Sequence, residues 1–145
     1  MKVYTIGFGK KSAKEFFNIL RKAHIGKILD IRLNNKSQLA GFSKGRDLKY
    51  FCEECHSIKY EHVPLLAPTK ELLKKYQKDK DWSYYEGEFS RILEERSIMA
   101  IFKKACGNVE NVCLLCSEPT TQNCHRRLVA EYIASHMNNV EIVHL

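Results

Sequence analysis

The chain has 145 residues, 44% of them hydrophobic and 28% charged, with a net charge of +7, which is ordinary composition for one globular domain. Since a chain of this length buries roughly two thirds of its unfolded surface, it needs neither disulfides nor a structural metal to fold. No apolar run approaches the ~20 residues of a membrane helix and the first residues lack a signal peptide, so we expect a cytoplasmic protein with six reduced cysteines.

The first thirty residues predict a strand, a helix and a second strand. Residues 3–6 form a short β-rich run that ends at Gly7. Ser12 can cap a helix that runs to about His24 and places its apolar residues on one face. Residues 27–31 are again typical of a strand, and the order strand, helix, strand usually builds a parallel sheet.

The middle of the chain predicts shorter elements. Residues 32–42 indicate a polar loop, after which Ser43 can cap a helix to about Ser57. Residues 60–63 predict a short strand that ends at Pro64, because proline cannot donate a backbone hydrogen bond to a sheet.

Three helices and a buried strand are predicted next. Residues 69–78 and 81–105 indicate helices, the second with Asp81 as its N-cap. Residues 111–116 predict a buried strand, because the continuous apolar run over 112–116 is typical of a strand covered on both faces. Residues 124–137 predict a helix whose inward face is formed by Leu128, Val129, Tyr132, Ile133 and His136.

The order of these elements predicts the fold class. Residues 140–143 indicate a last strand, so strands and helices alternate along the chain. We therefore expect a single α/β domain over residues 1–145, with a mostly parallel sheet of four or five strands and helices on both of its faces.

Polar side chains collect where three of the predicted strands end. The segments concerned contain Gly7, Asp30, Arg32, Cys116 and Glu118. Because ligands of parallel sheets bind beyond the carboxyl ends of the strands, we expect a site there. Side chains two apart on a strand share a face, so Asp30 and Arg32 could instead form a structural ion pair. Glu118 could simply interact with the start of the following helix.

Cys124, His125 and Arg126 open the last predicted helix. The start of a helix favours anions and can lower the pKa of a cysteine. An arginine at this position can bind a phosphate or a carboxylate, and a histidine can transfer protons. The alternatives are that Cys116 and Cys124 are core residues and that the helix start is a solvated turn. Zinc bound by Cys116, Cys124 and His125 is a further alternative.

Two cysteine pairs have the spacing of a zinc or redox motif, but their predicted geometry disfavours both functions. Cys52 and Cys55 fall on the apolar face of a helix, and Cys113 and Cys116 point to opposite faces of a strand. We therefore predict no metal and no cofactor.

Basic residues are concentrated in the first third of the chain. Residues 1–50 carry twelve basic and three acidic side chains, a net charge of +9, whereas the remaining residues carry twelve basic and fourteen acidic side chains, a net charge of −2. This distribution indicates a polyanionic partner such as nucleic acid, or else an ordinary solvated basic face.

The segment Leu114–Glu118, followed after five residues by Cys124–Leu128, resembles the signature of a bacterial and archaeal family known as domain of unknown function 488. Supporting segments are Thr5-Ile6-Gly7, Asp30-Ile31-Arg32, the Phe42 segment and Pro64-Leu65-Leu66. The resemblance implies a compact α/β fold and a prokaryotic cytosolic protein, but no activity. It implies signature positions for Asp30, Arg32, Cys116, Glu118, Cys124, His125 and Arg126. Many relatives carry a polar residue, often histidine, where this chain has Phe8.

We hypothesise an enzyme acting on an anionic substrate, such as a nucleotide, a nucleic acid or a phosphorylated metabolite. The predicted catalytic residues, with a cysteine as nucleophile, are Cys116, Glu118, Cys124 and His125. The predicted substrate-binding residues are Gly7, Asp30, Arg32 and Arg126, of which Asp30 could also transfer protons. The Cys-x5-Arg spacing of cysteine phosphatases is absent, since Gln122 and Ala130 stand where that arginine would be. The alternative is a non-catalytic module that binds nucleic acid through its basic first third, and neither hypothesis includes a membrane partner.

Overall fold

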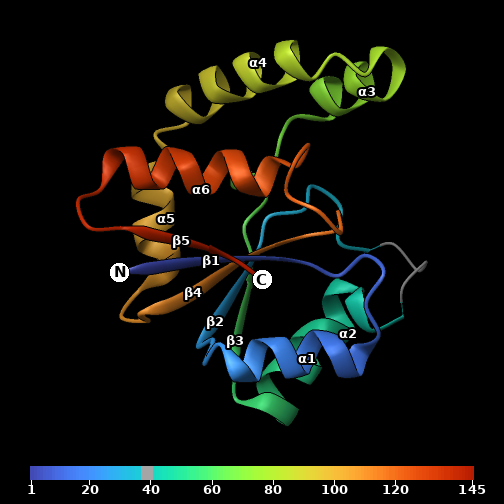
Figure 1. The fold of residues 1–145 in the computed structure, drawn as a ribbon, viewed down its shortest axis with the longest axis vertical. Coiled ribbons are helices and arrows are strands. Elements are labelled where there is room, and N and C mark those ends of the chain that lie inside the picture. Colours follow the sequence, from blue (N-terminus) through green and yellow to red (C-terminus); the bar gives the residue numbers. More distant parts are fainter. Residues whose placement is uncertain (37–40) are drawn as a thin grey trace.

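The computed structural model describes residues 1–36 and 41–145 (Figure 1). It confirms the predicted α/β fold, because five strands of the described residues form one sheet in the order β3-β2-β4-β1-β5 and every neighbouring pair is parallel. The strands are β1 (Lys2–Gly7), β2 (Lys27–Asp30), β3 (Lys59–His62), β4 (Asn111–Cys116) and β5 (Glu141–His144). Each predicted strand is present, with its bounds shifted by at most one residue.

Helices cover both faces of the sheet, as predicted. They are α1 (Ala13–Lys22), α2 (Gly45–Tyr50), α3 (Lys70–Asp79), α4 (Trp82–Glu95), α5 (Ile98–Cys106) and α6 (His125–His136). In Figure 1, α1 and α2 lie on one side of the sheet, α5 and α6 lie on the other, and α3 and α4 pack beyond α6. In the described part of the chain, no helix is long and apolar enough to cross a membrane.

The central strand β4 contributes to both halves of the core. Val112 and Leu114 pack with the residues of α4, α5 and α6, whereas Cys113 and Leu115 pack with those of α1 and α2. Side chains alternate between the faces of a strand, so a strand covered on both faces needs apolar residues at every position. This requirement explains the continuous apolar run of residues 112–116.

Local signals in the sequence fix the start of α1. The Ser12 hydroxyl accepts a hydrogen bond from the backbone N–H of Glu15 at 3.1 Å, and the Glu15 carboxylate accepts one from the backbone N–H of Ser12 at 2.8 Å. This reciprocal capping box satisfies two N–H groups that have no partner within the helix. The predicted cap is confirmed, and the helix ends at Lys22, two residues before the predicted end.

The helix predicted over residues 81–105 is two helices. Asp81 caps α4 as predicted, accepting a hydrogen bond from the backbone of Tyr84 at 3.1 Å. The chain then turns at Ser97, which has a φ of 53°, and α5 begins at Ile98. After the turn, α5 places the side chains of Ile98 and Phe102 in the core.

Two further predictions about helices are wrong. Ser43 does not cap α2, because it lies in a preceding 3-10 turn (Gly41–Ser43) and α2 begins only at Gly45, whose backbone N–H bonds the Asn35 carbonyl at 2.7 Å. His136 is exposed instead of facing inward, because it lies in the last turn of α6 and stacks on Tyr132 at its surface. In the predicted loop over 32–42, residues 37–40 lie outside the described residues.

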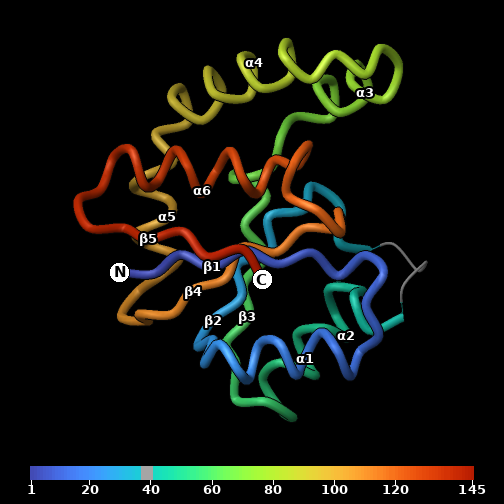
Figure 2. Tube along the Cα trace, in the orientation of Figure 1, coloured from blue at the N-terminus to red at the C-terminus, as the bar shows by residue number. Residues whose placement is uncertain are grey.

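The carboxyl ends of β1, β2 and β4 lie at one edge of the sheet, as predicted. β1 and β4 run in the same direction (Figure 2), and their register pairs Gly7 with Cys116. The pairing continues beyond the strands, where the N–H of Phe8 bonds the Cys116 carbonyl at 3.3 Å and the N–H of Ile31 bonds the Leu115 carbonyl at 3.0 Å. Segments more than eighty residues apart therefore meet at this edge.

Candidate functional site

Glycines at the end of β1 allow the loop after β4 to pack directly against it. A Cβ at Gly7 would lie 1.7 Å from the Glu118 carbonyl oxygen, and a Cβ at Gly9 would lie 2.6 Å from the Ser117 carbonyl oxygen. Both distances are far below van der Waals contact, so only glycine fits at these positions. The structure therefore gives Gly7 a packing role, and its contact with a substrate stays a prediction.

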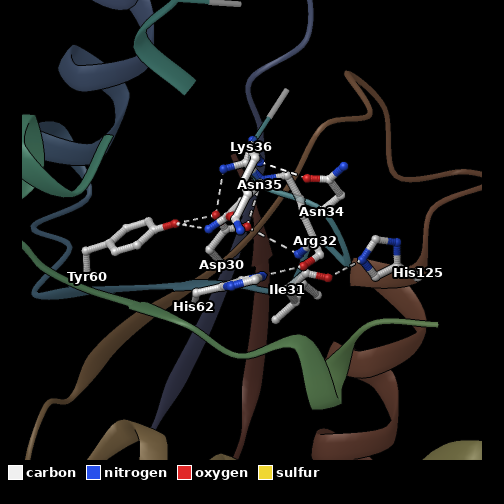
Figure 3. Close-up of polar contacts among 9 residues, drawn as sticks. All are labelled: Asp30, Ile31, Arg32, Asn34, Asn35, Lys36, Tyr60, His62 and His125. Atoms are coloured by element: carbon white, nitrogen blue, oxygen red, sulfur yellow. Dashed lines mark hydrogen bonds and ion pairs between the residues drawn. The ribbon is translucent and has the colours of Figure 1, made fainter. Parts of the chain in front are cut away.

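Asp30 and Arg32 form a buried ion pair at the end of β2 (Figure 3). Arg32 donates from Nε to Oδ1 of Asp30 at 2.8 Å and from Nη2 to Oδ2 at 2.6 Å. Arg32 is 6% exposed and Asp30 is 0% exposed. Burial acts to lower the pKa of Arg32, but the hydrogen bonds and charge of Asp30 outweigh it and raise the pKa. The structural ion pair that we considered as an alternative is thus present.

The edge strand β3 supports this ion pair with residues that the sequence analysis did not identify. The Tyr60 hydroxyl donates to Oδ2 of Asp30 at 2.5 Å and accepts from the side-chain amide of Asn35 at 3.1 Å. His62 donates from Nε2 to the Arg32 carbonyl at 2.7 Å, since a carbonyl can only accept. Figure 3 shows these side chains around Asp30. The alternation of residues 60 and 62 on a strand that also ends at this edge could have revealed them.

Cys116, Cys124 and Arg126 form a second group, which we call the thiol–arginine cluster. The two Sγ atoms lie 2.8 Å apart, and Nη1 of Arg126 lies 2.9 Å from Sγ of Cys116 and 3.5 Å from Sγ of Cys124. The same nitrogen donates to the Glu118 carbonyl at 2.6 Å. Cys116, Cys124 and Arg126 are 0%, 1% and 1% exposed, so the cluster is closed to solvent.

The electrostatics of this cluster favour one thiolate. No carboxylate of the described residues forms an ion pair with Arg126, and its buried Nε has no hydrogen-bond partner among them. Burial acts to raise the pKa of Cys116, but the hydrogen bond from Cys124 and the charge of Arg126 outweigh it and lower the pKa. The pKa of Cys124 is raised, first by the hydrogen bond between Cys124 and Cys116 and second by burial. Of the two sulfurs, Cys116 therefore carries a negative charge beside Arg126 more readily than Cys124 does.

A cavity of about 480 Å³ opens at the same edge of the sheet. Its lining residues are Phe8, Arg32, Leu33, Asn34, Ser43, Leu73, Gln77, Ser117, Glu118 and His125. The predicted site residues therefore separate into two groups. Arg32, Glu118 and His125 line the cavity, whereas the thiol–arginine cluster lies directly behind its wall, next in sequence to Ser117 and His125.

His125 links the two groups. It is half-buried at the start of α6, and its Nε2 donates to the carbonyl of Ile31 at 2.8 Å. Burial, assisted by the nearby charge of Arg126, lowers the pKa of His125 to about 4. The ring is therefore neutral near pH 7, and Nδ1 is its proton-accepting nitrogen.

A larger cavity, of about 820 Å³, lies at the opposite edge of the sheet, beside Lys2, Asn111 and Met137. These residues stand at the amino ends of β1 and β4 and after α6. The smaller cavity is the better candidate, because Arg32, Glu118 and His125 reach it from three segments of the chain. In residues 1–36 and 41–145, no three His, Cys, Asp or Glu side chains lie close enough to hold a metal ion.

Comparison with known proteins confirms the resemblance found in the sequence. A family model described as Domain of unknown function DUF488 matches residues 12–133, well over half of the chain. The match includes every predicted site residue except Gly7. No curated protein and no solved structure matches the chain.

Proposed function

The chain belongs to the DUF488 family, and we propose that it is an enzyme that binds a small anionic substrate in the cavity at the carboxyl edge of its sheet. One observation carries this proposal: Arg32, Glu118 and His125 come from three separate segments and line one cavity. A cavity with few convergent polar groups, at the carboxyl ends of parallel strands, is typical of an active site.

Arg32 is the proposed anion-binding residue. Its hydrogen bonds to Asp30 use Nε and Nη2, so Nη1 is the nitrogen proposed to donate to an anion. Since Asp30 neutralises the guanidinium charge, recognition depends on directed hydrogen bonds from Nη1 more than on net charge. Phe8 packs against Arg32, with the guanidinium carbon 5.0 Å from the ring centroid, and so limits the directions that the guanidinium can take.

His125 and Glu118 are the proposed proton-transfer residues. The neutral His125 ring accepts a proton at Nδ1, while its bond to Ile31 fixes the ring orientation. A bound anion would raise the pKa of His125 towards the range in which a histidine is an effective general base. The exposed carboxylate of Glu118 is a second proton carrier at the same cavity.

Arg126 is a positioning residue in this proposal. Its bond to the Glu118 carbonyl holds the cavity wall in place from behind. The nucleophilic role predicted for Cys116 or Cys124 stays a prediction, and it requires residues 117–123 to move away from the buried sulfurs.

Titration with inorganic phosphate, adenosine monophosphate and a dicarboxylate, followed by NMR, tests the proposal. We expect shifts in the His125 ring signals and in the amides of Arg32 and Glu118, with affinity reduced at least tenfold in Arg32→Gln. Arg46→Gln is the matched control, because Arg46 is exposed and forms an ion pair with its neighbour Asp47. Thermal unfolding of both variants checks that they are folded.

Turnover of any ligand that binds tests the assignment of the catalytic residues. His125→Gln should reduce kcat by about 100-fold or more, the usual contribution of a general base. Binding that instead falls steeply with salt, shifts exposed lysines and survives Arg32→Gln would contradict the proposal and support the nucleic-acid-binding module.

A further inference from the structure

The two sulfurs of the thiol–arginine cluster are close enough to become bonded with little movement. They lie 2.8 Å apart, and a disulfide bond is about 2.05 Å long, so closure shortens the separation by roughly 0.8 Å. One sulfur lies at the end of β4 and the other at the residue before α6, joined by a loop over 117–123. The pair is therefore brought together by the fold itself.

The surroundings of the two sulfurs are unequal. Nη1 of Arg126 is 0.6 Å closer to Cys116 than to Cys124, as the separations of 2.9 Å and 3.5 Å show. A buried guanidinium requires an anionic partner, and the described residues supply no carboxylate for it. Cys116 therefore has the environment of a reactive thiolate, and Cys124 has that of a thiol held beside it.

We propose that Cys116 and Cys124 are a redox-active pair, which a small hydroperoxide converts into a disulfide. The Cys116 thiolate attacks one peroxide oxygen, so that an S–O bond forms and the O–O bond breaks, and the leaving alkoxide or hydroxide takes up a proton. The Cys124 sulfur then attacks the Cys116 sulfenic acid. An S–S bond forms, the S–O bond breaks, and the departing hydroxide leaves as water with the Cys124 proton.

This redox step goes beyond the proposed function, because it uses neither the cavity nor Arg32. A disulfide is uncharged, so oxidation removes the anion that neutralises Arg126 and leaves a buried guanidinium uncompensated. Since Arg126 stabilises the reduced pair, we expect the disulfide to be readily reduced by a dithiol. The sulfurs are 0% and 1% exposed, so a small oxidant that enters during local opening fits better than a protein partner.

Peptide mapping of the full chain tests the proposal. The reduced protein is treated with equimolar hydrogen peroxide under native conditions, denatured in an alkylating agent and cleaved after Leu115 and Arg126. The resulting peptide contains Cys116 and Cys124 as its only cysteines. We expect this peptide to be two hydrogens lighter and to carry no alkyl group, as a disulfide between its cysteines requires. This disulfide should form at least tenfold faster than Cys55, the exposed cysteine, is oxidised.

Variants assign the two roles. Cys124→Ser should stop at a sulfenic acid on Cys116 that dimedone traps, and Cys116→Ser should leave Cys124 reduced. Arg126→Gln should shift the pH midpoint of oxidation upwards, Arg126→Lys should restore it in part, and the neighbouring Arg127→Gln should not change it.

Alkylation of both Cys116 and Cys124 in a sample in which Cys55 is already oxidised would overturn the proposal. Formation of the disulfide only after denaturation would overturn it as well. If a cysteine variant does not fold, the wild-type map still decides. Phosphate titration monitored at His125 separates this outcome from the function of the cavity, because that titration does not depend on either sulfur.

Discussion

The two arginines of the candidate site are both buried, but they are neutralised in different ways. Arg32 is 6% exposed and is bound by the Asp30 carboxylate through two hydrogen bonds of 2.6 and 2.8 Å. Arg126 is 1% exposed and has two sulfurs and a backbone carbonyl as its neighbours.

The difference determines which of the two charges can vary. A carboxylate keeps its charge throughout the neutral pH range, whereas a thiolate gains and loses its charge with pH and with oxidation. The Asp30–Arg32 pair is therefore a constant part of the site. The thiol–arginine cluster can change state while the fold persists, and four experiments can break or sharpen this contrast.

Replacing Asp30 should have the largest effect. Asp30→Asn keeps the shape of the side chain but leaves the Arg32 guanidinium buried without an anion, which costs about 3–5 kcal/mol of unfolding free energy. Urea denaturation measures this loss. Asp47→Asn is the control, because the ion pair of Asp47 with Arg46 is exposed and should contribute less than about 1 kcal/mol. A loss for Asp30→Asn as small as that of the control would show that Arg32 finds another partner.

Lowering the pH tests His125, which contacts the backbone between Asp30 and Arg32. An unfolded histidine binds a proton near pH 6.5, but folded His125 does so only near pH 4. Between these values the unfolded state binds more protons, so stability should fall by roughly 3 kcal/mol as the pH decreases through this window. His125→Gln should flatten the dependence measured by urea denaturation. An equally steep fall in the variant would assign the effect to other groups.

The charge of Cys116 should be visible in the stability of the reduced protein. Its folded pKa is lowered from 9.0, so the stabilisation is fully present above pH 9 and is lost as the pH falls through the folded pKa. Cys116→Ser should therefore lose roughly 1.5–3 kcal/mol at high pH and less at low pH. Cys113→Ser is the matched control: burial raises the pKa of Cys113, so its loss should be constant below about pH 8 and should become smaller, not larger, as the pH rises towards 9. Equal pH profiles for the two variants would contradict the thiolate assignment.

Adding a methyl group at Gly7 should have the smallest effect. The new Cβ would press on the Glu118 carbonyl and on Nη1 of Arg126, and overpacking of this kind costs about 1–3 kcal/mol. Thermal unfolding measures the loss. Gly87→Ala, in the middle of α4 with open space around it, should instead stabilise the protein by about 0.5–1 kcal/mol. A neutral Gly7→Ala variant would mean that the loop after β4 can move away from β1 at little cost.

The sequence predicted the strands and their common edge because these depend on local patterns. The apolar run of residues 112–116 and the capping box at Ser12 can each be recognised within a few consecutive residues. The break at Ser97 was missed, because neither glycine nor proline marks it and the packing of α5 decides it.

The sequence could not show how the site residues divide between the cavity and the thiol–arginine cluster. The burial of Cys116 and Cys124 depends on how residues 117–123 fold over them, and this loop contacts the backbone after β1 through Gly7 and Gly9. The bond from Tyr60 to Asp30 likewise depends on which strand lies beside β2. Such facts belong to the tertiary structure.

The position of β1 has a consequence for the biosynthesis of the protein. β1 is made before the other four strands, but its neighbours in the sheet are β4 and β5, which begin more than one hundred residues later. Pairings over such long sequence separations close late and slow the folding of a chain. A nascent chain on the ribosome cannot complete the sheet until β5, which follows α6, has emerged, so β1 has no strand beside it while residues 8–110 are being made.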